Sequence, residues 1–294
     1  MRNGDLDVFF QHEHQLYPPS TSDNGTLCFC SKSDLLECFE NVFPSSQEKP
    51  SMDVLILDGA AIINMLPPGQ SNRTFSDYAS NVFVPHILSK LNQVKRVDAV
   101  WDQYSPDSLK AATHTKRGSE VQCRVSSLTV LPRNWSDFLH VDENKTELFC
   151  LLSRCLKDQA VSSGKQLVIS DGCHILSCLS EVSVDYLDPC SDEEAHTRML
   201  LHIAHAVQEG HRKIAIRTVD TDVVVLAIGC CQRLTQLEEL WVAFGVGKNF
   251  RYMASRELNK ALGPERSLAL PYLHAFSGCD MVSSFGMEHM KFIS

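Results

Sequence analysis

The chain has 294 residues, of which 44% are hydrophobic and 21% are charged, so its composition excludes intrinsic disorder and allows a sizeable core. Its 27 Lys and Arg residues stand against 36 Asp and Glu residues, and the formal net charge of −9 excludes a general polyanion-binding protein. Any contact with nucleic acid therefore depends on a local basic patch or on metal ions.

The chain shows no signal for secretion or for membrane insertion. Residues 1–7 lack the apolar segment of a signal peptide, and no apolar run approaches the ~18 residues that span a bilayer. The 12 cysteines include no C-x₂-C pair, which favours reduced thiols over disulfides or a zinc site. We expect an intracellular protein without a membrane segment, either nuclear or cytoplasmic.

Residues 1–50 are predicted to form an N-terminal extension, and residues 51–294 the main domain. Within the extension, Pro- and Ser-rich loop signals flank one short helix from Lys32 to Phe43, which we expect to pack loosely on the main domain.

Short apolar runs alternate with longer helical patterns through the main domain. The predicted strands cover 53–58, 97–102, 166–170, 213–219 and 240–244, and the predicted helices cover 75–91, 143–163, 191–209 and a segment from about 222. Strands that alternate with helices predict an α/β fold with a mainly parallel central sheet flanked by helices. A Gly-rich segment, 245–248, is predicted to be a hairpin turn.

Acidic residues recur at the predicted strand ends. Asp58 and Asp102 end the first two strands, and Asp220 and Asp222 follow the fourth. Asp192 and Glu194 stand at the start of a helix, and Asp280 follows a later helical stretch. Ligands of open α/β sheets bind at the carboxyl ends of the strands, so this is where a site is expected.

Each of these residues also has a structural interpretation. Asp58 with Gly59 is typical of a turn, Ser191 with Glu194 is typical of a capping box, and Asp222 is a possible N-cap. His202 and His205 are expected at the helix surface or the edge of the core.

Taken together, carboxylates that converge on one edge would repel one another unless cations offset their charge. Mg²⁺ and Mn²⁺ prefer such ligands, and two of these ions about 4 Å apart can catalyse phosphodiester hydrolysis.

Five short motifs then suggest a family. They are Leu57-Asp58-Gly59, Val100-Trp101-Asp102, Asp192-Glu193-Glu194-Ala195, Val219-Asp220-Thr221-Asp222 and Gly278-Cys279-Asp280. In this order, over about residues 52–285, they resemble the PIN-like nuclease superfamily, in particular its flap-endonuclease and Asteroid-type branch. The resemblance implies a three-layer α/β/α fold and a nuclease that uses two Mg²⁺ or Mn²⁺ ions.

The resemblance also implies roles for individual residues. The implied metal ligands are Asp58, Asp102, Asp192, Glu194, Asp220, Asp222 and Asp280, and the implied catalytic residues are Asp58, Asp102, Glu194, Asp220 and Asp222. A local basic patch of Lys110, Lys116 and Arg117 would hold the phosphate of a DNA or RNA substrate.

The chain departs from the family pattern in several places, including a long extension before the first acid. Asp192 is shorter than the family's Glu, His196 stands where Asteroid-like relatives often carry an acid, and only 14 residues follow Asp280, where flap endonucleases continue into a helical DNA-binding motif. These departures favour the alternative of a catalytically inactive PIN-like domain that binds nucleic acid or protein. A third alternative is an α/β phosphohydrolase with Asp58 as the nucleophile.

Overall fold

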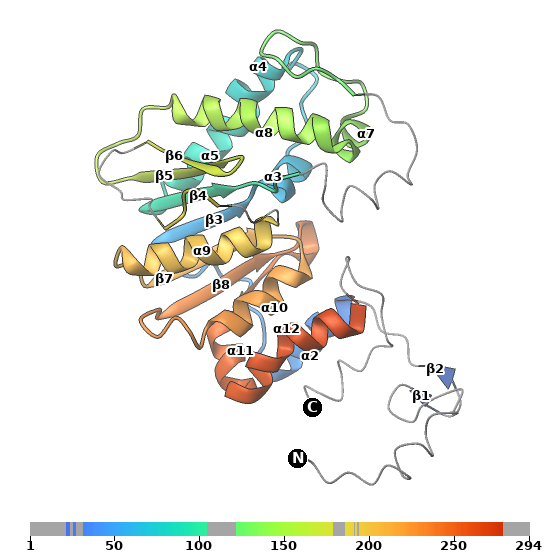
Figure 1. Cartoon of the computed structure of the whole chain (residues 1–294), viewed down its shortest axis with the longest axis vertical. Helices are drawn as coiled ribbons and strands as arrows, with labels where there is room; N and C mark the ends of the chain where they lie inside the picture. The colour runs from blue at the N-terminus through green and yellow to red at the C-terminus, as the bar shows by residue number, and fades with distance from the viewer. Residues whose placement is uncertain are drawn as a thin grey trace.

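The computed structural model describes residues 22–23, 26–27, 32–104, 122–178, 186–190, 192 and 194–278. Its centre is a seven-stranded sheet with helices on both faces, which confirms the predicted α/β class and the three-layer arrangement. Figure 1 shows α9 crossing the middle of the molecule, with α4, α5 and α8 toward one end and α10, α11 and α12 toward the other.

The sheet has the strand order β6-β5-β4-β3-β7-β8-β9. The five inner strands are mutually parallel, and the two edge strands β6 and β9 run antiparallel to their neighbours. The strands are β3 (Val54–Asp58), β4 (Arg96–Val100), β5 (Gln166–Asp171), β6 (His174–Ser177), β7 (Lys213–Thr218), β8 (Glu239–Phe244) and β9 (Arg251–Ala254). A separate ribbon pairs β1 (Ser22–Asp23) with β2 (Thr26–Leu27).

The helices form two layers. One layer contains α3 (Gly59–Met65), α4 (Phe75–Tyr78), the π-helix η1 (Ala79–Phe83), α5 (Val84–Leu91), α7 (Trp135–His140) and α8 (Asp142–Lys157). The other contains α2 (Lys32–Val42), α9 (Ala195–Gln208), α10 (Thr221–Cys230), α11 (Ser255–Leu262) and α12 (Pro264–Gly278). The helix predicted over 75–91 is therefore a continuous run of α4, η1 and α5.

The central strand β3 shows why the sheet needs both layers. All five of its residues are buried. Because successive side chains of a strand point to opposite faces, Leu55 and Leu57 pack with the α3–α8 layer while Val54 and Ile56 pack with the α9–α12 layer. The nearly unbroken apolar sequence of the strand follows from this burial on both faces.

The hairpin predicted over 245–248 is confirmed. It joins β8 to β9 through a short 3₁₀ turn, η3 (Gly247–Asn249). Gly245 has φ +83°, and a Cβ atom there would lie 2.5 Å from the Asn249 carbonyl oxygen, so this position requires glycine.

Helix α2 lies within the predicted N-terminal extension. Its Leu35, Leu36 and Phe39 side chains are almost fully buried in the core of the α9–α12 layer, which is tighter packing than the sequence suggested. The boundary between an extension of 1–50 and a domain of 51–294 stays a prediction.

A buried polar network joins β4 to α9. Arg96 donates two 2.6 Å hydrogen bonds to Asp98, and His202 Nδ1 lies 2.7 Å from the same carboxylate. Arg96 also reaches His205 Nδ1 at 2.9 Å. All four side chains are at most 2% exposed, so the expectation of surface or core-edge histidines at 202 and 205 was wrong. The two buried histidines of α9 thus each have a charged hydrogen-bond partner on β4, as buried polar groups usually do.

Candidate metal site at the strand ends

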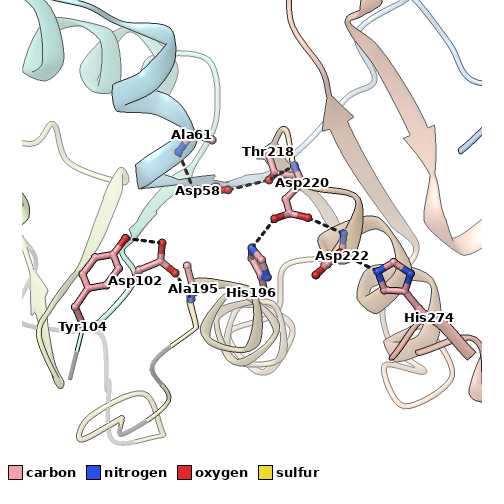
Figure 2. A network of polar contacts seen from close by, with 10 residues as sticks. All are labelled: Asp58, Ala61, Asp102, Tyr104, Ala195, His196, Thr218, Asp220, Asp222 and His274. Carbon is pink, nitrogen blue, oxygen red and sulfur yellow. Dashed lines mark hydrogen bonds and ion pairs between the residues drawn. The ribbon is translucent and has the colours of Figure 1, made fainter. Parts of the chain in front are cut away.

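Asp58 is the last residue of β3 and the N-cap of α3 (Figure 2). Its carboxylate accepts a 3.0 Å hydrogen bond from the Ala61 amide and a 2.8 Å hydrogen bond from the Thr218 hydroxyl, and the residue is only 6% exposed. Burial raises the pKa of the Asp58 carboxyl, and the charge of Asp102 adds to that rise, while the two hydrogen bonds oppose it. These contacts disfavour Asp58 as a free nucleophile.

Asp102 lies two residues beyond the end of β4. Its carboxylate accepts a 3.0 Å hydrogen bond from the amide of Ala195, the first residue of α9, and lies 3.5 Å from the Tyr104 hydroxyl. Negative charge is favourable at a helix N-terminus, so Asp102 anchors the start of α9 at the end of β4.

Asp220 and Asp222 follow β7 at the start of α10. Asp220, and not Asp222, is the N-cap: its Oδ1 accepts a 2.8 Å hydrogen bond from the Asp222 amide. Asp222 Oδ1 lies 2.8 Å from Nε2 of His274, a buried residue of α12. The Thr218 hydroxyl, which donates to Asp58, also accepts a 3.1 Å hydrogen bond from the Asp220 amide and so connects β3 to the turn after β7.

His196, the second residue of α9, lies between these carboxylates (Figure 2). Its Nε2 is 3.3 Å from Asp220 Oδ2. Burial lowers the pKa of His196, but the hydrogen bond to Asp220 and the charges of Asp220, Asp58 and Asp102 outweigh it and raise the pKa to about 9. At neutral pH this side chain is an imidazolium that offsets the surrounding negative charge. The pairing in turn lowers the pKa of Asp220 against the opposing effect of burial.

Three of these side chains could hold a metal ion. One ligand atom each from His196, Asp220 and Asp222 lies within 4.8 Å of the others, and all three residues are half-buried. Carboxylate oxygens suit Mg²⁺ and Mn²⁺, whereas imidazole suits metals such as Zn²⁺ and Fe²⁺ and binds a metal only in its neutral form. The three side chains could hold a metal ion, provided that His196 gives up its proton. A second cation stays a prediction.

The remaining predicted acids have different placements. Glu194 is the half-buried N-cap residue of α9. The pKa of Tyr104 is raised mainly by burial and by the charge of Asp102, and the charge of Glu194 makes a smaller contribution in the same direction. Within the described part of the chain, no hydrogen bond or ion pair joins Asp192 to the cluster. The expected Ser191–Glu194 capping box was wrong, because α9 begins at Ala195 and its cap is Glu194, which makes no side-chain capping bond.

Four predicted residues cannot be compared with the structure. Asp280 and the basic residues Lys110, Lys116 and Arg117 lie outside the described residues.

The sequence reasoning missed Thr218 and His274. Thr218 directly precedes the Val219–Asp222 motif, and a hydroxyl beside an acidic pair was a usable signal. His274 is 52 residues from Asp222, and nothing in the local pattern connects the two.

Neither a family model nor a curated protein matches this chain. The likeness to PIN-like nucleases therefore rests on the motifs alone and stays a hypothesis. Among the described helices, none has both the length and the apolar character that crossing a bilayer requires. The fold and the site together define an α/β protein with a candidate metal site at the carboxyl edge of its sheet.

Proposed function

We propose that the protein is a metal-dependent phosphodiesterase that acts on nucleic acid. One observation carries this proposal. Four acids at the ends of three neighbouring parallel strands gather around His196 at one edge of the sheet: Asp58, Asp102, Asp220 and Asp222 (Figure 2). Functional sites are where acidic groups with perturbed pKa values are concentrated. The carboxyl edge of an open α/β sheet is also the usual place for a ligand.

In this proposal Asp220, Asp222 and His196 hold the cation. A bound divalent cation supplies a water of lowered pKa and offsets negative charge on the phosphodiester. Asp58 is a positioning residue, because its carboxylate binds the Thr218 hydroxyl that in turn fixes the Asp220 amide. His274 orients Asp222 in the same way through its 2.8 Å contact. Lys110, Lys116 and Arg117 are proposed to bind substrate phosphates.

Replacing Asp220 or Asp222 by Asn tests the proposal directly. In an assay with single-stranded and duplex DNA and RNA and added Mg²⁺ or Mn²⁺, we expect cleavage by the wild type and a loss of about 100-fold in each variant, since a ligand oxygen is replaced by an amide. The control is Asp158→Asn, at the exposed end of α8, which should cleave as the wild type does. Equal cleavage by all four proteins, or none by the wild type, contradicts the proposal.

A second candidate function is a catalytically inactive interaction domain. The observation that favours it is that the acids already have cationic or polar partners: His196 pairs with Asp220, and His274 contacts Asp222. In this case His196 replaces the metal as the positive charge of the cluster.

Calorimetry with Mn²⁺ separates the two candidates. Binding that disappears in Asp222→Asn supports the metal-dependent enzyme, and absence of binding to the wild type supports the inactive domain.

A further inference from the structure

A cavity lies on the face of the sheet covered by α3 and α5. It has a volume of about 320 Å³ and is lined by β3, α3, α5 and the strands β7–β9. Leu55 and Leu57 of β3 and Ala243 of β8 contribute to its lining, and Met65 of α3 adds to it. Helices α10 and α11 pack on the other face of β8, through Leu240 and Val242. The cavity is thus separated from that helix layer by the sheet.

The ionisable groups around this cavity are bases, apart from the phenol of Tyr252. Lys49, His86, Lys90 and Arg217 line it, and no Asp or Glu occurs among its described lining residues. They come from three separate segments: the loop before β3, helix α5, which carries both His86 and Lys90, and strand β7. In a chain with a net charge of −9, this local concentration of bases is not a consequence of overall composition.

Arg217 is held in place by hydrogen bonds to backbone carbonyls. Its guanidinium donates to the carbonyl oxygens of Thr218, Ala243 and Gly245 at 2.7, 2.8 and 2.6 Å, and it lies 5.0 Å from the Phe250 ring. Backbone carbonyls fix the orientation of the guanidinium but carry no net charge, so its positive charge is not cancelled by them. Lys49 likewise donates to a neutral group, the side-chain oxygen of Gln93.

The bases repel one another. Burial lowers the pKa of Lys90, and the charges of Lys49 and Arg217 lower it further. Burial also lowers the pKa of His86, with added contributions from Lys90 and Arg217. Lys90 and Arg217 are half-buried, and like charges in such surroundings are destabilising. The charge of Asp58 offsets this in part at Arg217, and an anion in the cavity would offset it further.

We propose that this cavity binds a small organic anion that has a single carboxylate or phosphate headgroup and an apolar body. The headgroup lies among Lys90, Lys49 and Arg217, and the body packs against Leu55, Leu57 and Met65. The volume is at the lower end of the ~300–1,000 Å³ typical of small-molecule sites, which suits a short chain or a single ring. This site is independent of the proposed function, because its residues are distinct from the acidic cluster.

The probes are octanoate and octyl phosphate, compared with octylammonium, octan-1-ol and acetate, in calorimetry and thermal unfolding of the full chain. We expect both octyl anions to bind and to raise the melting temperature, because they supply charge and apolar area together. Octylammonium should not bind, and octanol and acetate should bind at least tenfold more weakly. A preference for octanoate over octyl phosphate, or the reverse, identifies the headgroup. Failure of both anions, or equal binding of octylammonium, overturns the proposal.

Two variants locate the binding site. Lys90→Gln should weaken octanoate binding about tenfold, since one charge-assisted contact is lost. Ala243→Leu should abolish binding by filling the cavity. The matched control is Lys157→Gln, at the exposed end of α8, which should leave the affinity unchanged. Unchanged affinity in a folded Lys90→Gln protein contradicts the proposal. If a variant fails to fold, the comparison of octanoate with octylammonium on the wild type decides.

Discussion

His196 is the residue on which the two candidate functions differ. As an imidazolium with a pKa raised to about 9 it compensates three carboxylates, and as a neutral ligand it would help to hold a cation. Its protonation decides whether the cluster carries its own positive charge or requires one from solution.

We therefore expect His196→Asp to destabilise the protein in the absence of metal. The change removes the central positive charge and adds a carboxylate, at a cost of ~1–3 kcal/mol in the free energy of unfolding. Added Mn²⁺ should restore stability if the cluster is a metal site. The measurement is urea unfolding with and without Mn²⁺, with His140→Asp on an exposed position of α7 as the control. A variant that Mn²⁺ does not stabilise speaks against a metal site.

Gly59 has a role that its sequence motif did not suggest. It is the first residue of α3, and a Cβ atom there would lie 2.1 Å from the Trp101 ring. Trp101 is 2% exposed, stacks on Phe149 at 4.5 Å and donates to the Ser153 hydroxyl, so it cannot easily move. The glycine therefore allows β3 and β4 to place Asp58 and Asp102 at the same edge.

Gly59→Ala should accordingly lower the free energy of unfolding by ~1–3 kcal/mol through overpacking. Gly69→Ala is the control, because its Cβ would make only an ordinary 3.6 Å contact with Asn72. Chemical denaturation of both variants is the measurement, and equal stability would show that Trp101 can rearrange.

At the scale of elements, the contact between β4 and α9 sets the position of the whole site. Asp98 on β4 pairs with Arg96 and His202, while Asp102 beyond its end binds the first amide of α9. Burial acts to raise the pKa of Asp98, but Arg96 and His202 outweigh it and hold the pKa well below its usual range. Burial lowers the pKa of His202.

Both shifts make the protein less stable in acid. Unfolded His202 binds a proton below about pH 6.5 while the folded state resists it, so the free energy of unfolding falls as the pH drops below that value. Asp98 stabilises the fold above its unfolded pKa of about 3.9, and this contribution is lost as the pH falls further.

When the pH falls from about 7 to about 5, we expect the free energy of unfolding to decrease less in His202→Gln than in the wild type. The reason is that glutamine keeps a donor for Asp98 but does not titrate. Part of the slope should persist, since burial also lowers the pKa of His86 and His211. Urea unfolding at the two pH values is the measurement, with His140→Gln as the control. An identical slope in His202→Gln and wild type would show that the network does not govern acid stability.

At the scale of the whole molecule, α2 contributes to the same core as the helices that carry the site. Phe39 has no exposed surface and packs with α10 and α11 residues in the α9–α12 layer. The α9–α12 layer therefore needs a segment from the predicted N-terminal extension.

Phe39→Ala should lower the free energy of unfolding by ~3–5 kcal/mol, as expected for a large cavity in a core. Leu128→Ala, at a position that is 85% exposed, should change it by less than ~0.5 kcal/mol. A small effect of Phe39→Ala in chemical denaturation would mean that α2 packs loosely, as the sequence suggested.

The sequence by itself determined the α/β class, the central strands and the positions of Asp58, Asp102, Asp220 and Asp222 beside strand ends. It could do so because a doubly buried strand and the polar residue that ends it are adjacent in the chain, and parallel strands bring those ends to one edge.

Only the tertiary structure decided how these acids are compensated and where the basic cavity lies. Asp222 contacts His274, which is 52 residues away, Thr218 contacts Asp58 across 160 residues, and the four bases of the cavity come from three separate segments. Such pairings depend on the packing of whole helices against the sheet, and no local pattern of residues encodes which distant side chains that packing brings together.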